Sequence, residues 1–128
     1  ENVQRRFTKR LYGMKYLSYS ERLSKLNLET LELRRVKFDL VYLFKIMHGL
    51  VGTDCNIFEL SHSLVLRGHN CKLKKPVVNK NIRLHSYACR VVDSWNSLPQ
   101  SAIDSTNVNV FISIINRINF SKLLHVTD

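Results

Sequence analysis

Residues 31–50 predict one long helix that is apolar on nearly every side. Its main apolar stripe has helical spacing and is formed by Leu33, Val36, Leu40, Leu43, Phe44, Met47 and Leu50. Other apolar side chains, such as Phe38 and Tyr42, fall on its remaining sides. A surface helix carries a single apolar stripe, so we expect this helix to be central and packed by neighbours on more than one side.

Capping signals predict further helices before and after this central one. Residues 18–21 form a capping box that begins a short helix, and Asn27 closes it. Thr30 is the expected N-cap of the central helix. Asn107 is the expected cap of a last helix, whose inward side chains are Val108, Phe111, Ile112, Ile115 and Ile118.

The single tryptophan lies in another predicted helix, residues 85–95, which Pro99 prevents from continuing. Helical spacing places Trp95 on the same side as Tyr87, Val91 and Val92. The ring could stack on a nucleobase, but this apolar side favours a place in the core.

The stretch 53–84 is the least regular part of the sequence. Apolar and basic residues alternate over 71–75, which indicates a strand, and Pro76 limits it to an edge. Pairing with Ile82–Leu84 across a turn would make a small hairpin.

The predicted fold is therefore mainly α, an irregular helical bundle with a small β-hairpin insert. We expect one domain, 1–128, with a three-helix part (1–52), this connection (53–84) and a C-terminal helix pair (85–128).

The chain is strongly basic, with 20 Lys and Arg against 10 Asp and Glu and a net charge of +10. Such an excess favours an anionic partner, with nucleic acid as the first candidate. A helix over residues 1–11 would gather Arg5, Arg6, Lys9 and Arg10 on one side, while Val3, Phe7 and Leu11 anchor the other. The strand adds further expected nucleic-acid-binding residues, Lys72, Lys74 and Lys75.

Arg67-Gly68-His69 allows two interpretations. The segment could bind a phosphate, or it could be a turn whose histidine makes one structural hydrogen bond.

No catalytic residue, metal site or cofactor is predicted. The acidic residues are scattered singly, whereas two-metal phosphoryl transfer needs paired carboxylates. The histidines do not cluster at ligand spacing, and the three cysteines lack CxxC spacing.

No apolar run is long enough to span a membrane, and the cysteine usage favours a reducing, intracellular compartment, nuclear or cytoplasmic.

The order and spacing of several segments resemble the C-terminal part of the reverse transcriptase of metazoan non-LTR retrotransposons of the jockey kind. The resemblance rests mainly on Val3-Gln4-Arg5-Arg6-Phe7-Thr8-Lys9-Arg10 and on Arg90-Val91-Val92-Asp93-Ser94-Trp95-Asn96-Ser97-Leu98-Pro99. In that family the region follows the palm and begins the thumb, which grips the template-primer duplex. The resemblance implies that the first basic helix lies near the duplex backbone, and that the catalytic palm lies upstream.

Two functions follow as expectations. The first is a non-catalytic, sequence-tolerant nucleic-acid-binding thumb segment of an RNA-directed DNA polymerase. The alternative is a domesticated or relic helical module that binds a protein partner or forms a homodimer through apolar surface.

Overall fold

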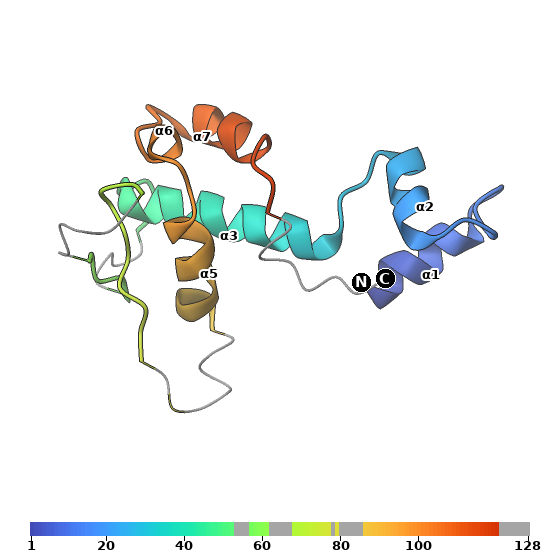
Figure 1. Ribbon diagram of the computed structural model, residues 1–128, viewed down its shortest axis with the longest axis horizontal. Helices are drawn as coiled ribbons and strands as arrows, with labels where there is room; N and C mark the ends of the chain where they lie inside the picture. The colour runs from blue at the N-terminus through green and yellow to red at the C-terminus, as the bar shows by residue number, and fades with distance from the viewer. Residues whose placement is uncertain (53–56, 62–67, 78, 80–85, 121–128) are drawn as a thin grey trace. The chain divides into compact units, whose positions relative to one another are not determined.

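The computed structural model describes residues 1–52, 57–61, 68–77, 79 and 86–120 (Figure 1). Over these residues the chain is mainly helical, as predicted. The helices are α1 (Asn2–Arg10), α2 (Tyr19–Leu26), α3 (Leu31–Met47), α5 (Tyr87–Asn96), α6 (Gln100–Ile103) and α7 (Val108–Ile115).

The described residues form two compact units. The first comprises Glu1–Arg35 together with Phe120, and the second comprises Val36–Asn119. The expected division of one domain into three parts stays a prediction.

In the first unit, the predicted helix boundaries are confirmed by their caps. The backbone N–H of Glu21 donates to Ser18 Oγ at 3.3 Å, and the N–H of Ser18 donates to Glu21 Oε2 at 2.7 Å, which completes the capping box. Asn27 ends α2 in the left-handed conformation, with φ at 51°. At the start of α3, Thr30 Oγ1 accepts from the N–H of Leu33 at 3.2 Å. Local sequence therefore fixes where these helices begin and end.

Polar contacts, and not the apolar stripe, hold α1 against α2. Thr8 is fully buried, and its Oγ1 accepts a hydrogen bond from Arg22 Nε at 3.1 Å. Val3 and Phe7 are 80% and 63% exposed, so the expectation that they anchor α1 is wrong, whereas Leu11, the third residue of that stripe, is half-buried. The physical reason is that a buried hydroxyl and a buried guanidinium satisfy each other, which lets a polar side of the helix face inward.

In the second unit, α3 packs against both α5 and α7. The ring of Phe44 on α3 stacks on Phe111 of α7 with centroids 4.4 Å apart, and the Trp95 ring of α5 lies 6.2 Å from Phe111. Trp95 is 1% exposed, which confirms it as a core residue. Phe38 is 64% exposed, however, so α3 is not covered on every side. The largest fully buried side chains of this unit are those of Leu40, Leu43, Phe44, Val91, Val92, Trp95, Phe111 and Ile115.

Of the C-terminal helices, the N-cap of α7 was predicted and the helix α6 was not. Asn107 caps α7 as expected, since its Oδ1 accepts from the N–H of Val110 at 3.0 Å. The one-turn helix α6 was not predicted. It follows Pro99 directly and buries Ala102 and Ile103.

The edge segment around Leu73 is paired with a segment that precedes it in the sequence. Leu73 forms an isolated antiparallel bridge with Leu60. Backbone hydrogen bonds flank the bridge, from Ser61 N to Lys72 O at 2.7 Å and from Lys74 N to Glu59 O at 2.8 Å. The predicted partner, Ile82–Leu84, lies outside the described residues. The hairpin insert is thus not seen in the described part of the chain, where the bridge partner of Leu73 is an upstream residue.

Candidate nucleic-acid interface

Three of the four predicted cations of α1 are exposed together. Because Thr8 is turned inward, the outward side of the helix carries Arg6, Lys9 and Arg10. Arg6 and Arg10 are one turn apart and therefore lie next to each other on the helix surface. The helix holds these cations at a fixed spacing, which suits contact with successive phosphates of a nucleic-acid backbone.

Arg5 has a different environment from the other three. Its guanidinium carbon lies 4.4 Å from the centroid of the Tyr19 ring, and the guanidinium carbon of Arg22 lies 5.7 Å from the same ring. The Tyr19 hydroxyl donates to Glu1 Oε2 at 2.6 Å. Burial and this hydrogen bond raise the pKa of Tyr19 to about 12, so the phenol stays neutral. Arg5 therefore contributes to packing within the first unit as well as to its positive charge.

The residues of α1 and of the loop that follows it include no acid. Between Asn2 and Ser20 the sequence has five Lys and Arg and no Asp or Glu. Glu21, the next acid, is held in the capping box, and its hydrogen bonds with Ser18 lower its pKa. The outward side of α1 thus carries positive charge with no acid in its own helix or in the loop that follows it.

The second predicted basic group is held in place by the end of α5. The side chain of Asn96 accepts from the N–H of Leu73 at 2.9 Å and donates to the Leu73 carbonyl at 2.8 Å, as a neighbouring strand would. Trp95 Nε1 donates to the carbonyl of Cys71 at 2.9 Å. Leu73 is buried, so alternation along the segment directs Lys72 and Lys74 to the other side.

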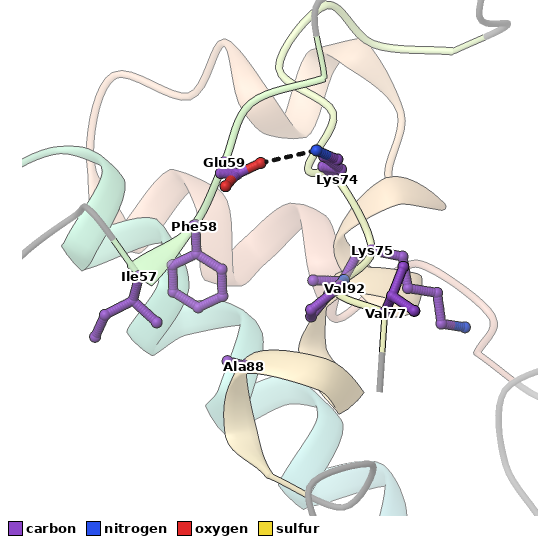
Figure 2. Close-up of a pocket in the computed structure, with 9 residues that line it drawn as sticks. Ile57, Phe58, Glu59, Lys74, Lys75, Val77, Ala88 and Val92 are labelled. Atoms are coloured by element: carbon purple, nitrogen blue, oxygen red, sulfur yellow. Dashed lines mark hydrogen bonds and ion pairs between the residues drawn. The ribbon is translucent and has the colours of Figure 1, made fainter. Parts of the chain in front are cut away.

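Two of these lysines are already paired with acids. Lys74 Nζ lies 3.1 Å from Glu59 Oε2, the pair drawn in Figure 2, and Lys75 Nζ lies 2.6 Å from Asp93 Oδ2. Both pairs are more than half exposed, so each contributes little to stability but does reduce the local positive charge. Lys72, Lys74 and Lys75 belong to the second unit, whereas the α1 cations belong to the first. The α1 group is the stronger candidate for binding phosphates.

A pocket of about 300 Å³ lies beside these lysines in the second unit (Figure 2). Its walls are mainly apolar, and the ionisable side chains among its lining residues are Glu59, Lys74 and Lys75. The described lining includes no nucleophile with an adjacent base, so the pocket offers space for an apolar group and not a recognisable reaction centre. It is lined by Ile57, Phe58, Glu59, Lys74, Lys75, Pro76, Val77, Ala88 and Val92.

Gly68 and His69 form a structural turn. Gly68 has φ at 109°, and a Cβ there would lie 2.9 Å from the end of the Lys72 side chain, so the position favours glycine. His69 is 2% exposed, and its Nε2 lies 3.0 Å from the Trp95 carbonyl. A carbonyl only accepts, so Nε2 carries the hydrogen, and burial lowers the pKa of His69. This confirms the turn with one structural histidine hydrogen bond; Arg67 lies outside the described residues.

Two exposed aromatic residues were missed in the sequence analysis. Tyr12 and Tyr16 are fully exposed in the loop between α1 and α2. The available signal was the placement of both tyrosines among basic residues, Arg10 and Lys15, in a segment without acids.

Within the described ranges, no cluster of His, Cys, Asp or Glu could hold a metal ion. Cys71 and Cys89 are free thiols, and Cys89 is buried in α5. None of the helices in this part of the chain is long and apolar enough to cross a membrane.

Comparisons of the chain with protein-family models, with curated proteins and with solved structures found no match. The resemblance to a reverse transcriptase thumb therefore stays a prediction, and the case for a nucleic-acid interface rests on the geometry and charge described above.

Proposed function

We propose that this chain is a non-catalytic nucleic-acid-binding segment that grips the backbone of a duplex, as the thumb of a non-LTR retrotransposon reverse transcriptase does. The observation that supports it best is the outward row of Arg6, Lys9 and Arg10 on α1, in a segment without acids. The proposed setting is a nuclear or cytoplasmic compartment, next to a polymerase palm on the same polypeptide, with no cofactor.

The proposed mechanism is neutralisation of phosphates with release of counterions. Cations on a helix can position a duplex without reading its bases, so the binding is tolerant of sequence. Lys72 adds positive charge in the second unit, while Lys74 and Lys75 would first have to leave Glu59 and Asp93.

Salt titration with a labelled duplex tests the proposal. The variant Arg6→Gln/Lys9→Gln/Arg10→Gln is compared with wild type at several salt concentrations, on an RNA–DNA hybrid and on a DNA duplex. We expect the salt slope of the variant to be smaller by about two to three units, roughly one for each phosphate that is no longer neutralised.

A matched control removes the same charge elsewhere. Lys25, Arg35 and Arg117 are all exposed, and none of them lies on α1. The variant Lys25→Gln/Arg35→Gln/Arg117→Gln should keep the wild-type slope. An equal reduction of the salt slope in the two triple variants would show that only net charge matters, and would contradict a defined interface on α1.

The alternative, a protein-interaction or dimerisation module, is favoured by Val3 and Phe7, two exposed apolar residues on the same helix. Sedimentation without nucleic acid tests it. A concentration-dependent dimer in wild type that is lost in Val3→Thr/Phe7→Gln would support this function over the first.

A further inference from the structure

The loop between α1 and α2 presents two aromatic rings to solvent. Tyr12 and Tyr16 are fully exposed, and neither ring stacks on another aromatic ring of the described residues. Tyrosine in a folded chain normally covers part of its ring against its neighbours. Two uncovered rings in one short loop are therefore available to a flat, apolar surface from outside.

The backbone of the loop that carries the two rings is braced. Met14, midway between them, is buried and anchors the loop. Three backbone hydrogen bonds brace it, from Leu11 N to Thr8 O, from Met14 N to Leu11 O and from Leu17 N to Met14 O, at 3.4, 3.1 and 3.3 Å. Because the backbone is already ordered, stacking on the rings would cost little further backbone entropy.

The charges around the rings favour an anionic partner. Lys9 and Arg10 are exposed in the last turn of α1, immediately before Tyr12. Lys15 Nζ lies 5.7 Å from the centroid of the Tyr16 ring. Flat rings among exposed cations complement a ligand in which flat apolar groups alternate with phosphates.

We propose that this loop, residues 11–17, is a stacking platform for unpaired bases of single-stranded nucleic acid. The strand would continue from a duplex whose backbone lies on Arg6, Lys9 and Arg10. This inference rests on the proposed function and adds to it a preference for a duplex that carries a single-stranded extension. Every base has a π face, so stacking on Tyr12 and Tyr16 tolerates any sequence.

The test compares binding of two labelled substrates, a blunt duplex and the same duplex with a single-stranded extension, at one low salt concentration. Wild type should prefer the extended substrate. Tyr12→Ala/Tyr16→Ala should lose about 5-fold or more in affinity for that substrate, since one base–ring stack is worth at least about that factor, and should bind the blunt duplex unchanged.

Two controls separate ring stacking from other effects. Tyr12→Phe/Tyr16→Phe keeps both rings and should retain the preference. Phe38→Ala removes another exposed aromatic ring, on α3, and should also retain it.

Each other outcome has a definite meaning. If wild type binds both substrates equally and with the same salt dependence, the stacking platform is overturned while the proposed function stands. If wild type binds neither substrate, the proposed function fails and the platform with it. If the alanine variant instead abolishes self-association measured without nucleic acid, the tyrosines bind a second copy of the chain and the platform is overturned.

Discussion

Arg22 on α2 donates from Nε to the hydroxyl of Thr8 on α1 at 3.1 Å, and both side chains are buried. Its guanidinium also donates to the carbonyl of Leu17 and lies against the Tyr19 ring. No ion pair joins Arg22 to an acid within the residues that the structure describes. A buried charge held by neutral groups depends on every one of its hydrogen bonds.

Thr8→Val should therefore lower the free energy of unfolding by about 1–3 kcal/mol, because it keeps the shape of the side chain but leaves Arg22 Nε without an acceptor. Denaturant unfolding measures the loss. Thr8→Ser keeps the hydroxyl and is the matched control, with a smaller loss expected. Adding Arg22→Met to Thr8→Val should recover part of the stability, since the unpaired charge is then gone. Wild-type stability in Thr8→Val would contradict this account of the α1–α2 contact.

Trp95→Ala should lower the free energy of unfolding by about 3–5 kcal/mol, because the ring fills the centre of the second unit beside Phe111. Trp95→Phe leaves the Cys71 carbonyl without its donor but keeps a ring in the core. We therefore expect it to lower the free energy of unfolding by less than Trp95→Ala does. Urea unfolding followed by far-UV circular dichroism suits both variants, since each removes the only tryptophan. Unfolding midpoints equal to that of wild type would show that the ring does not support the core.

The carboxylate of Asp39 binds Arg90 on α5, although Arg35 lies one helical turn away from it on α3. Arg90 Nε and one terminal nitrogen lie 2.6 and 3.0 Å from the two carboxylate oxygens, and Asp39 is only 17% exposed. A double-mutant cycle with Asp39→Asn and Arg90→Gln should give a coupling energy of about 1 kcal/mol. The same cycle with Arg35→Gln should give about zero. A coupling to Arg35 equal to that to Arg90 would contradict the pairing.

Stability should fall on acidification through His69. Burial lowers its pKa in the folded chain, the hydrogen bond to the Trp95 carbonyl opposes this, and nearby Lys72 lowers the pKa further. The unfolded chain, with the ordinary value of 6.5, takes up the proton first. The stabilising effect of the neutral imidazole is therefore complete above about pH 6.5 and is lost as the pH falls toward the lower folded value.

Urea midpoints measured between about pH 8 and about pH 5.5 check this expectation. His69→Gln should make the urea midpoint less dependent on pH over that range. His48→Gln, which removes an exposed histidine from the same unit, is the substitution control. A wild-type midpoint that does not fall with pH would contradict the buried, neutral state of His69.

Features that depend on a few neighbouring residues could be predicted from the sequence. The capping box at Ser18, the left-handed Asn27 and the caps at Thr30 and Asn107 each use contacts within a turn or so of the chain. The burial of Trp95 followed from one apolar helix side, because a side of that width has to be covered.

Features that depend on distant partners could not be predicted in the same way. The inward side of α1 is polar, and only the position of Arg22 explains why Thr8 is buried and Val3 is not. The partner of Leu73 is Leu60, and nothing in the alternation of residues 71–75 distinguishes that segment from the one that follows. For the candidate interface, the α1 cations were visible in the sequence, but the role of Arg5 depended on the distant Tyr19 ring.

The contacts between α1 and α2 also bear on the order in which the chain acquires structure. Thr8 and Arg22 are 14 residues apart in sequence, and Glu1 and Tyr19 are 18 apart, whereas Asp39 and Arg90 are 51 apart. Closing a short loop costs less entropy than closing a long one, so contacts between near neighbours form sooner. The helix pair that carries the cationic row should thus assemble before the core around Trp95 closes.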